Sequence, residues 1–236
     1  MALKQQLKTQ VRNAIRRRGW DLVRGPNLID FLRSRRVDLV FDVGANDGGY
    51  ATQIRRWGYG GQILSLEPTS DAFGKAQAAA RHDARWEVRQ LAAGAKPGRA
   101  EINVSRNTKF NSFRGPSAMA AEFDRNMEIV SVEAVEVATM DQLFAGLPAE
   151  RPFLKIDTQG FEREVLDGAP KLLERCVGVQ LELPIEHIYE GVWSFETGLA
   201  YMRERGFALA QMTPVSPITR DPACVLEFDC VFRRAS

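Results

Sequence analysis

Short apolar segments rich in β-branched residues alternate along this chain with stretches in which apolar positions recur about every three to four residues. The first pattern is typical of buried strands and the second of amphipathic helices. Strands are predicted over residues 39–43, 62–66, 86–92, 153–156, 178–183, 207–212 and 225–232. Helices are predicted over residues 27–35, 49–57, 68–80, 141–144, 161–173 and 195–205. This alternation favours one α/β domain with a mostly parallel sheet and helices on both faces.

The middle of the chain has a different pattern. Residues 100–105 and 132–138 alternate apolar and polar side chains, as half-exposed antiparallel strands do. Between them lies a mainly polar segment, about residues 106–131, which includes several Ser, Asn and Arg side chains. A connection this long inside a compact domain is more often functional than idle. We therefore predict a lid-like insertion here, with a surface excursion of no consequence as the alternative.

A glycine-rich turn follows the first predicted strand. Residues 40–49 read Val-Phe-Asp-Val-Gly-Ala-Asn-Asp-Gly-Gly, which is an apolar strand ending in a loop before a helix. Open α/β sheets bind nucleotides at such a turn. The second strand ends at Glu67, roughly 20 residues after the glycines, where a carboxylate can bind both hydroxyls of a ribose. Either half alone is compatible with a simple tight turn or a strand-end acid, but together they predict a site for an adenosine-type ligand.

The details of this turn favour S-adenosylmethionine over NAD as the cofactor. The dinucleotide-binding pattern needs Gly where this chain has Asn46. Asp42 and Asp47 flank the turn, and their charge would repel a pyrophosphate but attract a sulfonium and an α-amino group. The predicted cofactor-binding residues lie in the turn and at the ends of the second and third strands: Asp42, Gly44, Asn46, Gly48, Glu67, Pro68, Leu91 and Ala92.

Two further strands carry acids near their carboxyl ends, Asp157 and Glu182. In the predicted sheet these strands follow the first strand on the side away from Glu67, so both carboxylates are expected to line the crevice that holds the reacting methyl group. Such a pair can supply a general base or can bind Mg²⁺ through oxygen ligands. The alternative for Asp157 is a helix cap. His187 is a third candidate for accepting a hydroxyl proton near neutral pH, with a structural role in a loop as its alternative.

Composition and charge narrow the function classes. The 236 residues are 44% hydrophobic, which suffices for one domain with a full core. The three cysteines form no CxxC pair, so neither a disulfide framework nor a zinc site is predicted, and a cytoplasmic location is expected. No apolar run approaches the length of a membrane span, and the basic N-terminus lacks the apolar core of a signal peptide.

The charge is unevenly distributed. Residues 1–24 carry seven bases and one acid, a net charge of +6, so the remaining chain carries −4 of the total of +2. Residues 1–36 are predicted to form a basic, amphipathic helical segment that packs its apolar side on the domain. Peripheral contact of this segment with the inner membrane surface is the alternative. The mildly acidic remainder argues against nucleic acid as a partner.

Four sequence motifs point to one family: Phe41–Gly48, Leu66–Pro68, Val137–Asp141 and, most specifically, Leu154–Glu162 followed by Val165–Ala169. Over about residues 40–191 the chain resembles the FkbM family of S-adenosylmethionine-dependent methyltransferases. Met140 stands where that family usually has Leu, and Gln159 replaces a frequent Glu. The resemblance implies a Rossmann-like, seven-stranded class I methyltransferase fold with an antiparallel last strand. It also implies methyl transfer to oxygen, commonly on glycosyl groups or secondary metabolites.

The sequence therefore predicts an O-methyltransferase domain over residues 37–236. Asp157, aided by Glu182 or His187, would prepare a hydroxyl of a small molecule or glycoconjugate, such as a glycolipid sugar, for attack on the methyl group. One alternative is an RNA methyltransferase that binds RNA through its basic N-terminus. Another is a nucleotide-binding interaction module without catalysis. The intact Asp157 and Glu182 argue against that module.

Overall fold

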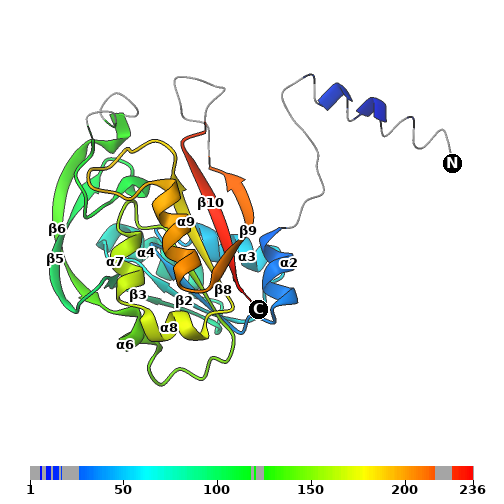
Figure 1. The fold of residues 1–236 in the computed structure, drawn as a ribbon. Helices are drawn as coiled ribbons and strands as arrows, with labels where there is room; N and C mark the ends of the chain where they lie inside the picture. The colour runs from blue at the N-terminus through cyan, green and yellow to red at the C-terminus, as the bar shows by residue number, and fades with distance from the viewer. Residues whose placement is uncertain are drawn as a thin grey trace.

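A seven-stranded sheet forms the centre of the computed structural model (Figure 1). The structure describes residues 27–117, 120, 125–215 and 225–235, together with residues 6, 9–11, 13–15 and 17. In spatial order, the strands are β3 (Trp86–Arg89), β2 (Gln62–Leu66), β1 (Leu39–Val43), β7 (Pro152–Ile156), β8 (Gly178–Pro184), β10 (Glu227–Arg234) and β9 (Phe207–Pro214). Neighbours from β3 to β8 are parallel, and β10 is antiparallel to both β8 and β9. The predicted mostly parallel sheet with an antiparallel last strand is confirmed.

The central strand β1 is buried on both faces along its whole length. It pairs in register with β2 and β7, which places Asp42 beside Ser65 on one side and beside Lys155 on the other. A nearly continuous apolar run is typical of a parallel strand that helices cover on both faces. Asp42 and Lys155 interrupt two such runs, and both lie one residue before the carboxyl end of their strand.

Helices cover both faces of the sheet, as predicted (Figure 1). Phe41 packs in a core with α6 (Met140–Phe144), α7 (Glu162–Asp167), α8 (Pro170–Arg175) and α9 (Phe195–Glu204). Val40 packs in a second core with α2 (Leu28–Ser34), α3 (Gly49–Arg56) and α4 (Ser70–Ala80). Because successive side chains of a strand point to opposite faces, one apolar run supplies both cores.

The single helix predicted over residues 161–173 is wrong, because the structure contains two short helices there, α7 and α8. The break falls at Gly168 and Ala169. Pro170 begins α8 and has no N–H to continue the preceding helix, and it restricts the backbone of Ala169. A Cβ atom on Gly168 would lie 2.1 Å from the carbonyl oxygen of Gly94, so the chain turns where only glycine fits.

A second, three-stranded sheet packs beside the first in the order β4 (Ala92–Ala93), β6 (Ile129–Ala138) and β5 (Gly98–Ser105). The antiparallel pairing of β5 and β6 confirms the prediction for residues 100–105 and 132–138. The strand predicted over residues 86–92 is divided. β3 ends at Arg89, and β4 leaves the main sheet to pair with β6. Between β5 and β6 lie the 3₁₀ turns η1 (Thr108–Phe110) and η2 (Arg125–Met127).

Most of the basic N-terminal segment lies outside the described residues, so its predicted amphipathic helix and membrane contact stay predictions. The part from residue 27 onward forms α2, whose first turn is capped by Asn27. Parts of the predicted lid, residues 118–119 and 121–124, also lie outside the described residues. Within the described part of the chain, no helix has the length and apolar character needed to cross a membrane.

Candidate active site

The turn after β1 is held tightly against the neighbouring strands. The backbone N–H groups of Gly44 and Ala45 both donate to the carbonyl oxygen of Leu66, at 3.0 Å. Gly44 has a φ of +75°, and a Cβ atom at this position would lie 1.8 Å from the carbonyl oxygen of Asp157. Asn46 also has a left-handed backbone, with a φ of +48°. The turn thus needs glycine where the loops after β1 and β7 touch.

Glu67 links this turn to the turn after β2. One carboxylate oxygen accepts a hydrogen bond from the backbone N–H of Asn46 at 2.9 Å. The other accepts from the backbone N–H of Thr69 at 3.0 Å and from its hydroxyl at 2.6 Å. Glu67 is only 5% exposed, and this burial raises its pKa, although the bonds from Thr69 and Asn46 lower it in part. The oxygen facing Asn46 has one donor among the described residues, which leaves room for one more hydrogen bond.

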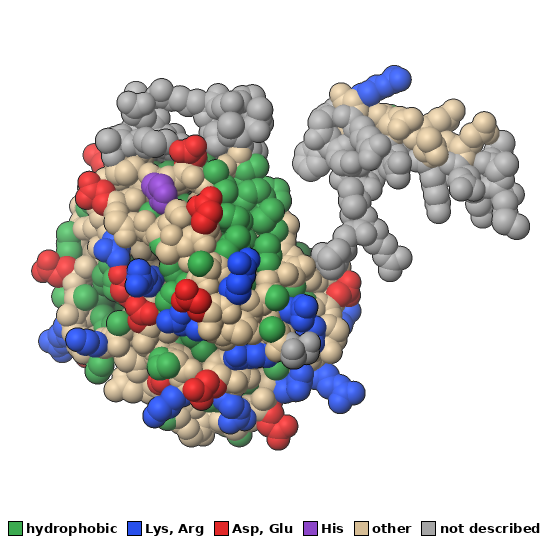
Figure 2. All heavy atoms as spheres, viewed as in Figure 1, with side chains coloured by type: hydrophobic (Ala, Val, Ile, Leu, Met, Phe, Trp, Pro, Cys, Tyr) green, Lys and Arg blue, Asp and Glu red, His purple; other side chains and the backbone are tan. Residues whose placement is uncertain are grey.

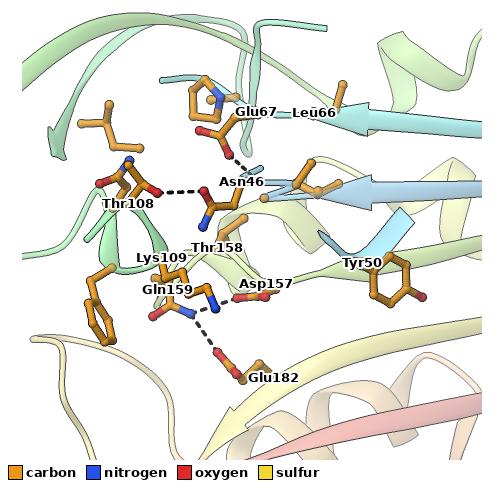
Figure 3. Close-up of a pocket in the computed structure, with 18 of the residues that line it drawn as sticks. Asn46, Tyr50, Leu66, Glu67, Thr108, Lys109, Asp157, Thr158, Gln159 and Glu182 are labelled. Carbon is orange, nitrogen blue, oxygen red and sulfur yellow. Dashed lines mark hydrogen bonds between the residues drawn. The ribbon is translucent and has the colours of Figure 1, made fainter. Parts of the chain in front are cut away.

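A cavity of about 670 Å³ opens over the carboxyl ends of β1, β2, β7 and β8 (Figure 3). This volume is within the usual range for small-molecule sites, and its position is where open α/β sheets bind ligands. The sequence-predicted residues that line it are Gly44, Asn46, Glu67, Pro68, Leu91, Ala92, Asp157 and Glu182. The topology therefore brings the predicted acid pair and most of the predicted cofactor residues into one cavity.

The described part of the insertion forms another wall of this cavity. The Thr108 hydroxyl donates to the side-chain oxygen of Asn46 at 2.9 Å (Figure 3). The side-chain amide of Asn111 donates to the Thr69 hydroxyl at 3.2 Å. Farther along, the Ser112 hydroxyl donates to the backbone oxygen of Gln159 at 2.6 Å. The described part of the insertion thus contacts both the glycine-rich turn and the acid-bearing loop, and its role as a lid stays a prediction.

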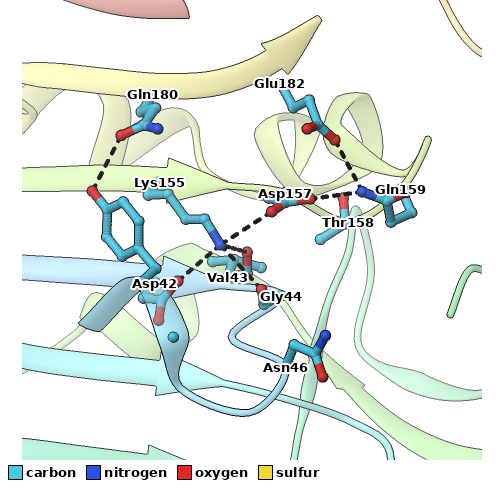
Figure 4. Close-up of polar contacts among 12 residues, drawn as sticks. Asp42, Val43, Gly44, Asn46, Lys155, Asp157, Thr158, Gln159, Gln180 and Glu182 are labelled. Atoms are coloured by element: carbon cyan, nitrogen blue, oxygen red, sulfur yellow. Dashed lines mark hydrogen bonds and ion pairs between the residues drawn. The ribbon is translucent and has the colours of Figure 1, made fainter. Parts of the chain in front are cut away.

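Asp42, expected at the cofactor, does not line the cavity. Its side chain is fully buried beneath the turn, where it forms an ion pair with Lys155 at 2.9 Å and accepts a hydrogen bond from the Ser65 hydroxyl at 3.0 Å (Figure 4). Burial alone would lower the pKa of Lys155, but the carboxylates of Asp42 and Asp157 raise it above its ordinary value. The charge of Asp42 is therefore neutralised inside the protein. Of the two acids flanking the turn, only Asp47 reaches the cavity.

Two other predicted residues also lie outside the cavity lining. Gly48 caps the start of α3 with a φ of +82°, where a Cβ atom would contact the Trp86 ring at 3.0 Å. Its role is to begin the helix. His187 is exposed in the loop after β8, and its backbone oxygen accepts a hydrogen bond from the Ser117 hydroxyl. Of the residues in that loop, Ile188 lines the cavity and His187 does not.

Three carboxylates meet at the end of the cavity opposite Glu67. Asp157 comes from the loop after β7, Glu182 from β8 and Glu227 from the antiparallel strand β10. Burial raises the pKa of Glu182 well above its ordinary value, and the charges of Asp157 and Glu227 raise it further. Burial, followed by the charges of Asp157, Glu162 and Asp229, raises the pKa of Glu227 to about 8. A carboxylate whose pKa is raised toward neutral pH can take part in proton transfer there.

The sequence of residues 42–209 matches the methyltransferase FkbM domain. This match spans most of the chain, including the turn after β1, Glu67 and the acid-bearing loops. The chain belongs to the FkbM methyltransferase family. Membership of this family implies S-adenosylmethionine as the methyl donor. A comparison with curated proteins found no significant match to the sequence.

Solved methyltransferase structures resemble this FkbM protein at low identity. Magnesium protoporphyrin IX methyltransferase from Synechocystis PCC 6803, solved with bound S-adenosylmethionine, is 11% identical, with a TM-score of 0.49 over 88% of this chain and 76% of its own. An rRNA methylase from Streptococcus thermophilus is also 11% identical, with a TM-score of 0.48 over 91% of this chain and 100% of its own. These likenesses do not bear on the acceptor of the FkbM protein.

The described residues of the FkbM protein fit the methyl donor at one end of the cavity. Glu67 keeps an acceptor position for a ribose hydroxyl, and Leu91 and Ala92 offer the small apolar surface that a purine ring needs. Mg²⁺ fits less well. No group of three or more His, Cys, Asp or Glu side chains is arranged to bind a metal in the part of the chain that the structure describes. The side-chain amide of Gln159 also occupies the space between Asp157 and Glu182 (Figure 4).

Sequence reasoning missed Lys155, Gln159 as a site residue, and Glu227. Lys155 had a signal, because one basic residue interrupts an apolar strand while one acid, Asp42, interrupts its neighbour. Gln159 lies within the motif that carries the resemblance, but only the structure shows what its amide contacts. No sequence signal indicated Glu227, because its position relative to Glu182 depends on the register with which β10 pairs with β8 in the folded sheet.

Glu227 should make the stability of the FkbM protein depend on pH. A carboxyl whose pKa is raised in the folded state contributes stability that is fully present below its unfolded pKa and is lost as the pH rises through the folded value. For Glu227 the loss of stability is expected between pH 4.5, its ordinary pKa, and about pH 8, its pKa in the folded protein. We expect Glu227→Gln to be more stable than the wild type at about pH 9 by about 1–3 kcal/mol, with the advantage disappearing in acid.

Thermal unfolding of Glu227→Gln across this pH range measures the effect. The matched control is Glu174→Gln, an exposed glutamate on α8, which should leave the pH dependence of Tm unchanged. A constant difference in Tm between Glu227→Gln and wild type at every pH would show that Glu227 does not hold a proton in the folded protein.

Proposed function

We propose that this protein transfers a methyl group from S-adenosylmethionine to a hydroxyl oxygen of a glycosyl group or a related small molecule. The observation that carries the proposal is the cluster of Asp157, Glu182 and Glu227 at the end of the cavity opposite Glu67. A hydroxyl must lose its proton as it attacks a methyl group, and a carboxylate placed beside it can accept that proton. The aromatic rings of Phe110 and Phe113 from the insertion line the same cavity and offer flat apolar surfaces to a sugar ring.

In this reaction the residues of the protein bind the methyl donor, align the acceptor hydroxyl and accept its proton. S-adenosylmethionine supplies an electrophilic methyl group on a sulfonium and leaves as the neutral thioether. Glu67 binds the ribose, and the turn at Gly44 fixes the distance between cofactor and acid-bearing loop. The acceptor hydroxyl gives its proton to a carboxylate oxygen of the Asp157–Glu182 pair while its oxygen bonds to the methyl carbon. Alignment and proton acceptance suffice for such a transfer.

Glu67→Ala should weaken S-adenosylmethionine binding by about 10- to 200-fold, because a hydrogen bond to a charged group contributes about 1.5–3 kcal/mol. The substitution also removes the carboxylate that holds the backbone of Asn46. Isothermal titration calorimetry measures the affinity directly. The matched control is Glu133→Ala, whose carboxylate bonds Ser70 outside the cavity lining. Equal affinities in Glu67→Ala and wild type would reject the role assigned to Glu67.

An RNA acceptor is the second candidate, and the described surface gives it little support. On the face shown in Figure 2, Lys and Arg side chains are interspersed with Asp and Glu across the described residues rather than gathered into one basic surface. RNA binding relies on clustered positive charge. The strongly basic residues 1–24 lie mainly outside the described part. The labelling experiment described next can detect methyl transfer to RNA. It can also detect transfer to a glycolipid that contacts the N-terminal segment at a membrane.

The proposal is tested by incubating the purified full-length protein with isotopically labelled S-adenosylmethionine and an extract of cells that lack it. We expect label in a glycoconjugate or small-molecule fraction, in a linkage that survives mild base as a methyl ether does. Asp71→Asn, a surface variant, serves as the active control and Glu67→Ala as the inactive one. Label in RNA, or in a base-labile ester, would contradict O-methylation of a hydroxyl on a sugar or small molecule.

A further inference from the structure

The side-chain amide of Gln159 lies between the two carboxylates of the candidate acid pair (Figure 4). Its Nε2 atom donates to Oδ1 of Asp157 at 2.9 Å and to Oε2 of Glu182 at 2.9 Å. Both N–H bonds of one amide group are therefore used, one for each carboxylate. Two carboxylates that share one central partner are the arrangement in which proteins often hold a divalent cation.

Contacts on its other sides fix the orientation of this amide. The Tyr189 hydroxyl donates to Oε1 of Gln159 at 2.9 Å. Burial raises the pKa of Tyr189, and nearby carboxylates raise it further, so the hydroxyl keeps its proton and acts as a donor. Since Oε1 accepts from Tyr189, Nε2 must face the two acids. The side chain has no freedom to turn its oxygen toward them without losing three hydrogen bonds.

The backbone of Gln159 is held just as firmly. Its carbonyl oxygen accepts a hydrogen bond from the Ser112 hydroxyl at 2.6 Å, and its φ is +54°. A left-handed backbone is unusual for a residue with a side chain, and it persists only where its surroundings enforce it. Here the conformation turns the side chain back between β7 and β8. Gln159 is thus an anchored residue at the base of the cavity.

Among the described residues, positive charge near the acid pair comes from Lys155 and from Lys109, which lines the cavity with its side chain directed toward Asp157 (Figure 3). Lys155 lies 3.6 Å from Asp157, but it is shared with Asp42 at 2.9 Å. Besides burial, the groups that raise the pKa of Glu182 are Asp157, Glu227, Asp229 and Glu162, which are all acids. A cation between Asp157 and Glu182 would offset the repulsion between their carboxylates. The neutral side-chain amide of Gln159 lies there instead and donates one hydrogen bond to each carboxylate.

We propose that Gln159 is a positioning residue that takes the place of a divalent cation and holds Asp157 and Glu182 as a metal-free pair. The inference rests on their assignment as the acid pair of the proposed methyl transfer, although its tests require no acceptor. It follows that the identity of residue 159 decides whether this pair binds a proton or a metal ion. A carboxylate at position 159 would complete a three-carboxylate cation site.

Mn²⁺ titration followed by electron paramagnetic resonance tests this at about pH 8.5, where protons compete less with the metal ion for carboxylate oxygens. We expect the wild type to show no specific Mn²⁺ site and Gln159→Glu to bind one ion at least about tenfold more tightly than any wild-type binding. Gln142→Glu introduces the same change on α6, where residue 142 completes a capping box on the surface, and should not create a site. The proposal would be overturned if the wild type bound Mn²⁺ and Glu182→Gln abolished that binding. It would also be overturned if Gln159→Glu folded but bound no Mn²⁺.

A second measurement separates positioning from mere support of the fold. Gln159→Met keeps the length of the side chain but removes both N–H donors, so the pKa of Glu182 should rise. Nuclear magnetic resonance of the labelled glutamate carboxyl carbons follows this titration, and S-adenosylmethionine binding measured in parallel reports whether the cofactor half is intact. Unchanged carboxyl titration in Gln159→Met would contradict the proposal. A failure to find O-methylation would leave these results standing, so the two hypotheses are tested separately.

Discussion

Asp157→Asn should lower the rate of methyl transfer by about 100- to 10,000-fold, the usual contribution of general acid–base catalysis. Asp157 lines the cavity, with one oxygen bonded to Gln159 and the other 3.6 Å from the ammonium group of Lys155. Asparagine keeps the shape of the side chain and can still accept the bond from Gln159. It cannot accept a proton. The loss should therefore fall on the chemical step, while affinity for S-adenosylmethionine stays within about threefold.

Single-turnover transfer of a labelled methyl group, with the acceptor fraction found in extract, measures this rate. Calorimetry of the same preparation measures cofactor affinity. Asp71→Asn is the matched control, because Asp71 forms an exposed ion pair with Lys75 on α4. A transfer rate close to that of wild type in Asp157→Asn would remove Asp157 from the proton transfer and leave Glu182 or Glu227 as the acceptor.

Lys155→Met should destabilise the fold by about 3–5 kcal/mol, because removing one partner of a buried ion pair leaves the other charge uncompensated. The side chain of Lys155 is 5% exposed and that of Asp42 is 0% exposed. Lys155 also donates to the carbonyl oxygen of Gly44 at 3.0 Å and lies 5.1 Å from the centre of the Tyr50 ring. The predicted loss is a large fraction of the total stability of a typical domain.

Urea denaturation of Lys155→Met and of the double variant Asp42→Asn/Lys155→Met measures the effect. An asparagine at position 42 would keep an acceptor for the Ser65 hydroxyl but carry no charge, so the double variant should recover at least about half of the lost stability. Lys171→Met, at an exposed position on α8, is the control and should change stability by less than about 0.5 kcal/mol. A double variant that is less stable than Lys155→Met would show that the charge of Asp42 is compensated by other groups.

The sequence predicted the main sheet well because its strands are buried on both faces and leave an unbroken apolar signal. β1 and β2 begin and end at the predicted residues, 39–43 and 62–66. The strand predicted over residues 86–92 failed at Arg89, because a strand at the edge of one sheet can pass its last residues to another sheet without any change in local pattern. That choice depends on Val137 and Ala138 of β6, which pair with Ala92 and Ala93 from 45 residues later in the chain.

The sequence identified the residues that line the cavity where their position depends on strand ends, and did not where it depends on the direction of a side chain or loop. Glu67, Asp157 and Glu182 line the cavity because parallel strands deliver their carboxyl ends to one edge. Asp42 lies one residue before such an end, so it points into the layer between the sheet and α3, where Lys155 meets it. His187 lies five residues after Glu182, and the direction of its loop cannot be read from local sequence.

The backbone contact at Gly44 has a consequence for how tolerant this enzyme is to change. At this point the loop that receives the donor and the loop that presents the acid pair touch without any side chain between them, since even a methyl group would overlap the carbonyl of Asp157. A bulkier residue would force the two loops apart, and a displacement of about 1 Å can slow an aligned transfer about 100-fold. We therefore expect a substitution at Gly44 to impair methyl transfer although glycine carries no charged or reactive side chain.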